Sequence, residues 1–265
     1  MAAGGTEHVA HRRDRSGARA EARLDTTPLL ELSGITRVLQ RGPVPQPLLK
    51  DVSLALHRCD FVVVWGRARS GKTTLLRIAS GLERPDAGVV RVAGDDLGAM
   101  SPTARGAVRL GAIGVADTDG TEAGELRVLD YVALPIAHRA GRRRALKEAR
   151  ATLRRLDVGH AADTTWRSLG DLERAHVSLA HAVARRPQLL LVDDLTKNLD
   201  PLDEADFLTR LSRLAQDIGA AVLLVSSALP TAAFAHETYL ISGGTLRPVE
   251  DSQHRVARLH EDRRR

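Results

Sequence analysis

The chain has 265 residues and a hydrophobic content of 43%, enough for one large α/β domain with a small inserted subdomain. Its formal net charge is +6, and no apolar run approaches the roughly 18 residues of a membrane-spanning helix, which excludes a transmembrane segment. The single cysteine, Cys59, excludes an internal disulfide, fits a reducing compartment, and is expected to be a small buried hydrophobe.

Both ends of the chain predict tails. Residues 1–27 are rich in Ala, Gly and Arg and are expected to be disordered, and residues 250–265 predict a charged tail. The first 27 residues carry both charge signs and no apolar core, so we do not expect them to be a secretory signal. The arginines of the chain are interleaved with acids and not with aromatic residues, which favours solvated charge and no nucleic-acid partner.

The first half of the chain predicts strands on both sides of a helix. Residues 29–65 alternate short apolar runs with turn residues, which indicates antiparallel strands that lead into a buried strand at 62–64. A helix is expected from Thr73 onward, and the alternating residues 89–92 predict a further strand. Ser101 is placed to cap a short helix, and a strand is expected near residues 110–116.

The second half has a different character. Residues from about 125 to 168 have helical periodicity without a strand signal, which indicates a helical insertion. The elements expected after it are helices at 171–186 and 200–219, strands at 187–194 and 220–227, and a Gly-Gly hairpin at 238–249. We therefore expect one α/β domain over residues 28–249, with a helical subdomain at about 120–170.

The pattern G-x-x-x-x-G-K-T stands between the buried strand and the helix that follows it. Glycines let the backbone curl until successive N–H groups face an anion, and the helix adds its positive N-terminal end. In such a phosphate-binding loop the lysine reaches the β- and γ-phosphates and the threonine hydroxyl holds Mg²⁺. The alternative is a Gly-rich loop with an incidental lysine. The predicted nucleotide-binding residues are Gly66, Arg67, Ala68, Arg69, Ser70, Gly71, Lys72, Thr73 and Thr74, with Thr73 also a metal ligand.

An apolar run at residues 188–194 ends in Asp193 and Asp194. A run without a polar face predicts a strand that is buried on both sides in a parallel sheet, and ligands bind at the carboxyl ends of such strands. Asp193 is therefore placed to bind Mg²⁺ on the phosphates, and Asp194 is placed to face the attacking water as the catalytic carboxylate. The alternative is a strand end with two turn carboxylates.

With both motifs in place, residues 29–249 resemble the ATP-binding subunits of ABC transporters, most of all those that serve lipoprotein-release and macrolide-export permeases. Residues 66–74 correspond to the family's Walker A loop, and LLLVDDLTKNLD corresponds to its Walker B strand and D-loop. The resemblance implies an ABC-type P-loop NTPase fold that binds ATP and Mg²⁺. It also implies a membrane permease as partner, a homodimer or heterodimer with another ATP-binding subunit, and a cytoplasmic position at the inner face of the cell membrane.

Several positions depart from the family's pattern. Leu39 stands where the family stacks an aromatic ring on adenine, and Arg69 replaces the middle glycine of the loop. The family's glutamine ahead of the helical subdomain falls at about Thr118. There we favour an ordinary Asp-Gly turn over metal ligation by Asp117 and Asp119.

Three further departures bear on hydrolysis. The family's signature Leu-Ser-Gly-Gly-Gln is LGDLE at residues 169–173, in which Asp171 either repels phosphate or simply caps the following helix. Asp194 replaces a catalytic glutamate one methylene longer, and a shift of about 1 Å costs on the order of 100-fold in rate. Ser227 replaces a histidine that reaches the γ-phosphate. We therefore expect weak hydrolysis, with a regulatory or interaction protein outside transport as the alternative function.

Overall fold

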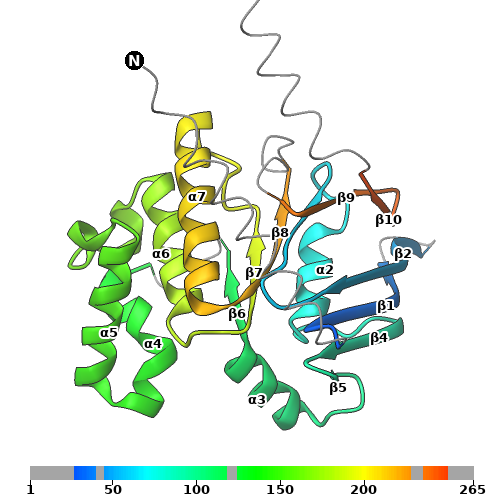
Figure 1. The fold of residues 1–265 in the computed structure, drawn as a ribbon, viewed down its shortest axis with the longest axis horizontal. Helices are drawn as coiled ribbons and strands as arrows, with labels where there is room; N and C mark the ends of the chain where they lie inside the picture. Colours follow the sequence, from blue (N-terminus) through cyan, green and yellow to red (C-terminus); the bar gives the residue numbers. More distant parts are fainter. Residues whose placement is uncertain (1–26, 40–44, 118–123, 228–234, 250–265) are drawn as a thin grey trace, which may run out of the picture.

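The computed structural model describes residues 27–39, 45–117, 124–227 and 235–249. Residues 1–26 of the tail predicted at 1–27 lie outside the described residues, as do the predicted tail at 250–265 and Thr118 of the predicted turn. Figure 1 shows an antiparallel sheet (blue to teal) at one end of the molecule and the helices α4 and α5 (green) at the other, with parallel strands between them. The expected α/β fold, with an antiparallel sheet, a parallel core and added helices, is confirmed.

The antiparallel sheet is formed mainly by the first apolar runs of the chain. Its strand order is β2-β1-β4-β5, and both neighbours of β1 run antiparallel to it. Alternate residues of β1 are buried at its start, as the alternating sequence predicts for a strand with one face on a core. The bounds are β1 Leu30–Leu39, β2 Gln46–Leu56, β4 Ala87–Val92 and β5 Asp95–Asp96.

The second sheet is the parallel core, with strand order β10-β9-β3-β8-β7-β6. All its neighbouring strands are parallel except β9 and β10, which form the predicted hairpin. Gly243 and Gly244 both have positive φ in that turn, a conformation that glycine adopts readily. The bounds are β3 Phe61–Trp65, β6 Ile113–Ala116, β7 Leu189–Asp193, β8 Ala221–Ser226, β9 Glu237–Ser242 and β10 Thr245–Pro248.

The parallel strands separate two hydrophobic cores. Successive side chains of a strand point to opposite faces, so Val62 and Val64 pack with the antiparallel sheet while Val63 packs with the helices. The same alternation places Leu191 in the first core and Val192 in the second. Because both faces of β3, β7 and β8 are covered, these three strands are buried and apolar at nearly every position.

Six α-helices are described. The residues 72–79 that follow β3 form α2, whose apolar side chains share the core of the antiparallel sheet. The Ser101 hydroxyl accepts a hydrogen bond from the Ala104 amide at 3.2 Å, which confirms the predicted cap of α3. The bounds are α2 Lys72–Ala79, α3 Pro102–Ala112, α4 Val128–Ala140, α5 Arg142–Arg155, α6 Asp171–Val183 and α7 Pro201–Ile218.

Two local expectations were wrong. The strand expected near residues 110–116 begins only at Ile113, because α3 continues through Ala112. Short apolar runs satisfy both helical and strand periods, so the sequence does not place this boundary. Cys59 is exposed, not buried, because it lies in the turn between β2 and β3 with a positive φ of 62°.

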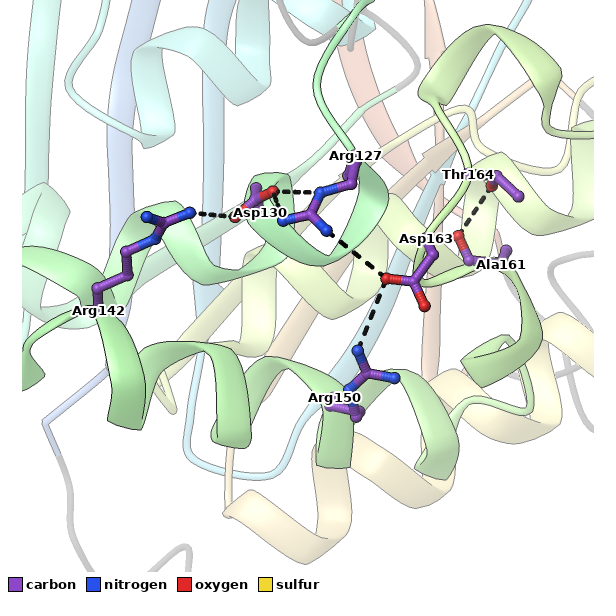
Figure 2. Close-up of polar contacts among 7 residues, drawn as sticks. All are labelled: Arg127, Asp130, Arg142, Arg150, Ala161, Asp163 and Thr164. Carbon is purple, nitrogen blue, oxygen red and sulfur yellow. Dashed lines mark hydrogen bonds and ion pairs between the residues drawn. The ribbon is translucent and has the colours of Figure 1, made fainter.

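Ion pairs connect the start of α4 with α5 and with Asp163, in the loop after α5 (Figure 2). Arg127 contacts Asp130 at 2.7 Å and Asp163 at 3.8 Å. Arg142 reaches Asp130 and Arg150 reaches Asp163, each at 3.7 Å. These ion pairs are partly or fully exposed, so each contributes only about 0–1 kcal/mol to stability.

An aromatic cluster joins α4 to α6 and to the 3-10 helix that precedes α6. Tyr131 on α4 stacks on His181 of α6 with ring centroids 4.3 Å apart, and meets the edge of Trp166 at 5.4 Å. Trp166 belongs to the short 3-10 helix η3 Trp166–Ser168, which follows η2 Gly159–Ala161. Burial raises the pKa of Tyr131 to about 12, so its hydroxyl stays protonated at neutral pH.

No helix in the described part of the chain is long and apolar enough to cross a membrane.

Candidate functional site

A cavity of about 750 Å³ opens at the carboxyl ends of β3 and β7. This is the edge of a parallel sheet at which ligands bind in open α/β folds. The cavity is lined by Leu39, Leu48, Ala68, Arg69, Gly71, Lys72, Thr73, Thr74, Asp117, Trp166, Asp171, Arg174, Asp193, Asp194, Leu195, Lys197, Asn198 and Ser227. The phosphate-loop motif and the paired aspartates therefore line one cavity, although Lys72 and Asp193 are 121 residues apart in the sequence.

Two glycines give the loop after β3 its tight path. A Cβ on Gly66 would lie 2.5 Å from the Ile241 carbonyl oxygen and 2.9 Å from Ser70 Oγ. Gly71 has a φ of 102°, and a Cβ there would meet Leu49 at 2.9 Å. The loop is thus a cradle that side chains at either position would distort, as the motif requires for backbone N–H groups to surround an anion.

Lys72 is folded back onto this cradle. Its Nζ donates to the carbonyl oxygens of Gly66 at 2.7 Å and Arg67 at 3.0 Å, and the residue is only 6% exposed. Burial lowers the pKa of Lys72, and the negative charges of Asp194 and Asp193 oppose that shift. The ammonium group is therefore held at the base of the cavity and next to two carboxylates.

Thr73 and Asp193 form the second polar pair of the site. The Thr73 hydroxyl is hydrogen-bonded to the Asp193 carboxylate, while burial raises the pKa of Asp193. Asp117 and Asp194 raise that pKa further, and Lys72 lowers it. Among the described residues no group of three His, Cys, Asp or Glu side chains would hold a metal alone. One hydroxyl and one carboxylate suit Mg²⁺, which takes its remaining ligands from phosphate and water.

Asp194 is held by Ser227, which follows the end of β8. The Ser227 amide donates to Asp194 Oδ1 at 2.9 Å, and the Ser227 hydroxyl donates to Oδ2 at 2.6 Å. Asp194 has a positive φ of 49° where the chain leaves β7. The serine that replaces the expected histidine is thus a partner of the catalytic-position carboxylate, which sequence analysis missed.

The start of α6 differs from its expected capping. The helix begins at Asp171 and its N-cap residue is Gly170, so Asp171 is not the cap. The Gly170 amide is instead satisfied by the carboxylate of Glu173 at 2.9 Å, and Glu173 also contacts His160 at 2.6 Å. Asp171 accepts a hydrogen bond from Arg174 at 3.3 Å, and both side chains line the cavity.

Six of the nine predicted loop residues line the cavity, and the other three are Gly66, Arg67 and Ser70. Gly66 and Arg67 hold Lys72 through their carbonyl groups, and the Ser70 hydroxyl is buried without a partner among the described atoms. Lys197 lines the cavity beside the paired aspartates, a positive charge that the motifs do not predict. The aliphatic Leu39 also lines the cavity, consistent with the missing aromatic ring at this position.

Comparison with known proteins gives a consistent result. The family model of the ABC transporter matches residues 49–197. The lipoprotein-releasing system ATP-binding protein LolD 2 of Caulobacter vibrioides is 33% identical over 221 residues, which cover 83% of this chain and 96% of that protein. The macrolide export ATP-binding/permease protein MacB of Syntrophobacter fumaroxidans is 29% identical, over 83% of this chain and 31% of that longer protein.

Solved structures share the fold. The dimeric structure of MJ0796, titled a bacterial ABC transporter cassette, has a TM-score of 0.77 at 23% identity and covers 83% of this chain and 97% of its own. A second dimeric structure of that cassette, in a post-hydrolysis state bound to ADP and Pi, gives the same score, identity and coverage.

Proposed function

Because this chain belongs to the ABC transporter family, we propose that it is the ATP-binding subunit of a transporter, binding Mg·ATP and coupling to a membrane permease on a separate chain. Its relatives of similar length carry the name of an ATP-binding protein of a releasing system, which supports this role over a non-transport one. It covers only 31% of the macrolide-export relative, an ATP-binding/permease protein by name.

One observation carries the proposal: Lys72, Thr73 and Asp193 line a single cavity at the end of the parallel strands. A glycine cradle, a buried ammonium and a hydroxyl–carboxylate pair are the groups that a magnesium-bound triphosphate needs. The sequence positions of these groups are far apart, so their convergence supports nucleotide binding more strongly than either motif alone.

Each residue has a defined chemical task in this proposal. Lys72 exchanges the carbonyl oxygens of Gly66 and Arg67 for phosphate oxygens, which also relieves the cost of burying its charge. Thr73 and Asp193 would hold Mg²⁺, which would supply positive charge to the phosphate oxygens. Asp194 accepts a hydrogen bond from the attacking water and orients it toward the phosphate.

Hydrolysis is proposed to be weak. Asp194 is one methylene shorter than a glutamate, so its carboxylate ends closer to the β7 backbone, and a misplacement of about 1 Å costs on the order of 100-fold in rate. Asp171, paired with Arg174 at 3.3 Å, places a carboxylate side chain on the cavity wall where the family's signature has a bare glycine. In a dimer, each site would combine the phosphate loop of one chain with the signature segment of the other. The altered signature segment of this chain, residues 169–173, would then face the nucleotide bound by its partner.

The partner and location follow from this role. We infer a homodimer or a heterodimer with a second ATP-binding subunit, docked on a permease at the inner face of the cell membrane. Recovery of a membrane permease with the tagged chain after detergent extraction would support the transport role. Recovery of the chain from washed membranes without any permease would favour the regulatory alternative.

The direct test is calorimetric titration with Mg·ATP of wild type, Lys72→Ala and Lys147→Ala. Lys147 lies on α5, exposed and outside the cavity, so it controls for the loss of one positive charge. We expect Lys72→Ala to weaken binding by about 30-fold, from about 2 kcal/mol of charge-assisted hydrogen bonding, and Lys147→Ala to leave binding unchanged. Wild-type protein that gives no heat at millimolar nucleotide would remove the proposal, and equal binding by Lys72→Ala would place the nucleotide elsewhere.

A further inference from the structure

Sheet register brings Asp194 and Ser227 together. In the parallel pair β7–β8, Asp193 lies opposite Val225, so the residues that follow the two strand ends are neighbours. The Asp194 amide donates to the Val225 carbonyl at 3.0 Å, which fixes the Asp194 backbone to β8. Ser227, the residue after β8, donates two hydrogen bonds to the Asp194 carboxylate. The backbone and the side chain of Asp194 are therefore both hydrogen-bonded to this end of β8.

The two contacts use different oxygens of the carboxylate. The Ser227 amide engages Oδ1 and the Ser227 hydroxyl engages Oδ2, at 2.9 and 2.6 Å. Two donors from one residue leave the carboxylate little freedom to rotate, and among the described residues each oxygen keeps an unused acceptor site. Both residues line the cavity, so those remaining acceptor sites are available to a ligand or a water.

We propose that Ser227 is a positioning residue for phosphate-bond hydrolysis: it fixes the Asp194 carboxylate at the cavity wall so that a free acceptor site orients the attacking water. This inference rests on the proposed function. Serine suits the task because its short side chain lets its own amide and hydroxyl reach the same carboxylate. The function of this position in the chain is therefore to hold the carboxylate, not to contact phosphate directly.

The competing explanation is a strand-end hydrogen bond that only stabilises the fold. It predicts that Ser227→Ala lowers stability and changes no step of the reaction. Ser101→Ala is the matched control, because it also removes one hydroxyl hydrogen bond, at the start of α3 and outside the cavity. Ser227→Thr keeps both the amide and a hydroxyl, so it tests rescue.

The first readout does not depend on turnover. Without nucleotide, we expect the Ser227 amide to exchange with deuterium about tenfold faster in Asp194→Ala than in wild type, followed by NMR, because its charged acceptor is gone. Exchange at the Ala104 amide should stay unchanged in the same variant. Equal exchange at Ser227 in both proteins would overturn the proposal, because the contact would then be absent in solution.

The second readout separates positioning from binding. We expect Ser227→Ala to lower kcat for ATP about tenfold with KM changed less than twofold, Ser227→Thr to recover most of the loss, and Ser101→Ala to have no effect. Added to Asp194→Ala, Ser227→Ala should cause no further loss. An unchanged kcat in Ser227→Ala, or wild type without hydrolysis, overturns the positioning role. Mg·ATP binding by calorimetry would in either case leave the proposed function standing.

Discussion

Acidification should destabilise this protein through one buried histidine. His176 on α6 is 4% exposed, packs on Phe207 with ring centroids 5.6 Å apart, and its Nε2 has no partner among the described atoms. Burial, with help from the positive charge of Arg210, lowers its pKa from 6.5 to about 4. The nearby carboxylates of Asp206 and Asp157 oppose the shift without cancelling it. The folded protein therefore holds this ring neutral.

The sign of the effect follows from linkage. Between pH 6.5 and about pH 4 the unfolded chain binds a proton at His176 that the folded chain does not, so stability falls as pH falls through this window. At about pH 5, protonated His176 exceeds neutral His176 roughly thirtyfold in the unfolded chain, whereas in the folded chain the ring is mostly neutral. The free energy of unfolding is therefore about 2 kcal/mol lower than at neutral pH. The contribution is fully present above pH 6.5.

The assay is urea unfolding followed by circular dichroism at pH 7.5 and pH 5.0. We expect the difference in unfolding free energy between the two pH values to be about 2 kcal/mol smaller in His176→Phe than in wild type. His138→Gln, at an exposed position of α4, should keep the wild-type difference. Equal pH differences in wild type and His176→Phe would refute the reasoning.

Three other predictions concern the cradle, the core and the start of α6. Gly66→Ala places a methyl group against the Ile241 carbonyl, so Mg·ATP affinity should fall at least about tenfold by calorimetry while the circular dichroism spectrum is kept. Phe207→Ala should cost about 3–5 kcal/mol in urea unfolding, whereas Leu202→Ala, at a position 83% exposed, should change stability by less than about 0.5 kcal/mol. Glu173→Ala removes the capping carboxylate of α6 and should cost about 1 kcal/mol in the same assay, where no change would contradict the capping contact.

The sequence predicts most of the fold because its local patterns agree with one another. The apolar runs before Lys72 and Asp193 are typical of strands buried on both faces, and the structure confirms both as parallel strands. The boundary between α3 and β6 was misplaced because residues 110–112 satisfy either period. The cap of α6 is Gly170, one residue before Asp171, because glycine can occupy an N-cap and the Glu173 carboxylate here satisfies its amide.

The site is predicted only as far as its motifs reach. Lys72, Thr73 and Asp193 lie in motifs with fixed spacing, so their convergence in one cavity follows from the strand order. The contact of Ser227 with Asp194 depends on the register of two strands 33 residues apart along the chain, and no local pattern encodes it. Lys197 likewise reaches the cavity through the path of the loop after β7.

The placement of the two tryptophans has a practical consequence. Trp166 lines the cavity, whereas Trp65 ends β3 immediately before the phosphate loop and packs against the helical core. These are the only indole rings in the sequence. Intrinsic emission excited at the indole band therefore reports from one wall of the cavity and from the strand that leads into the loop, and the unmodified chain carries its own optical probe of occupancy.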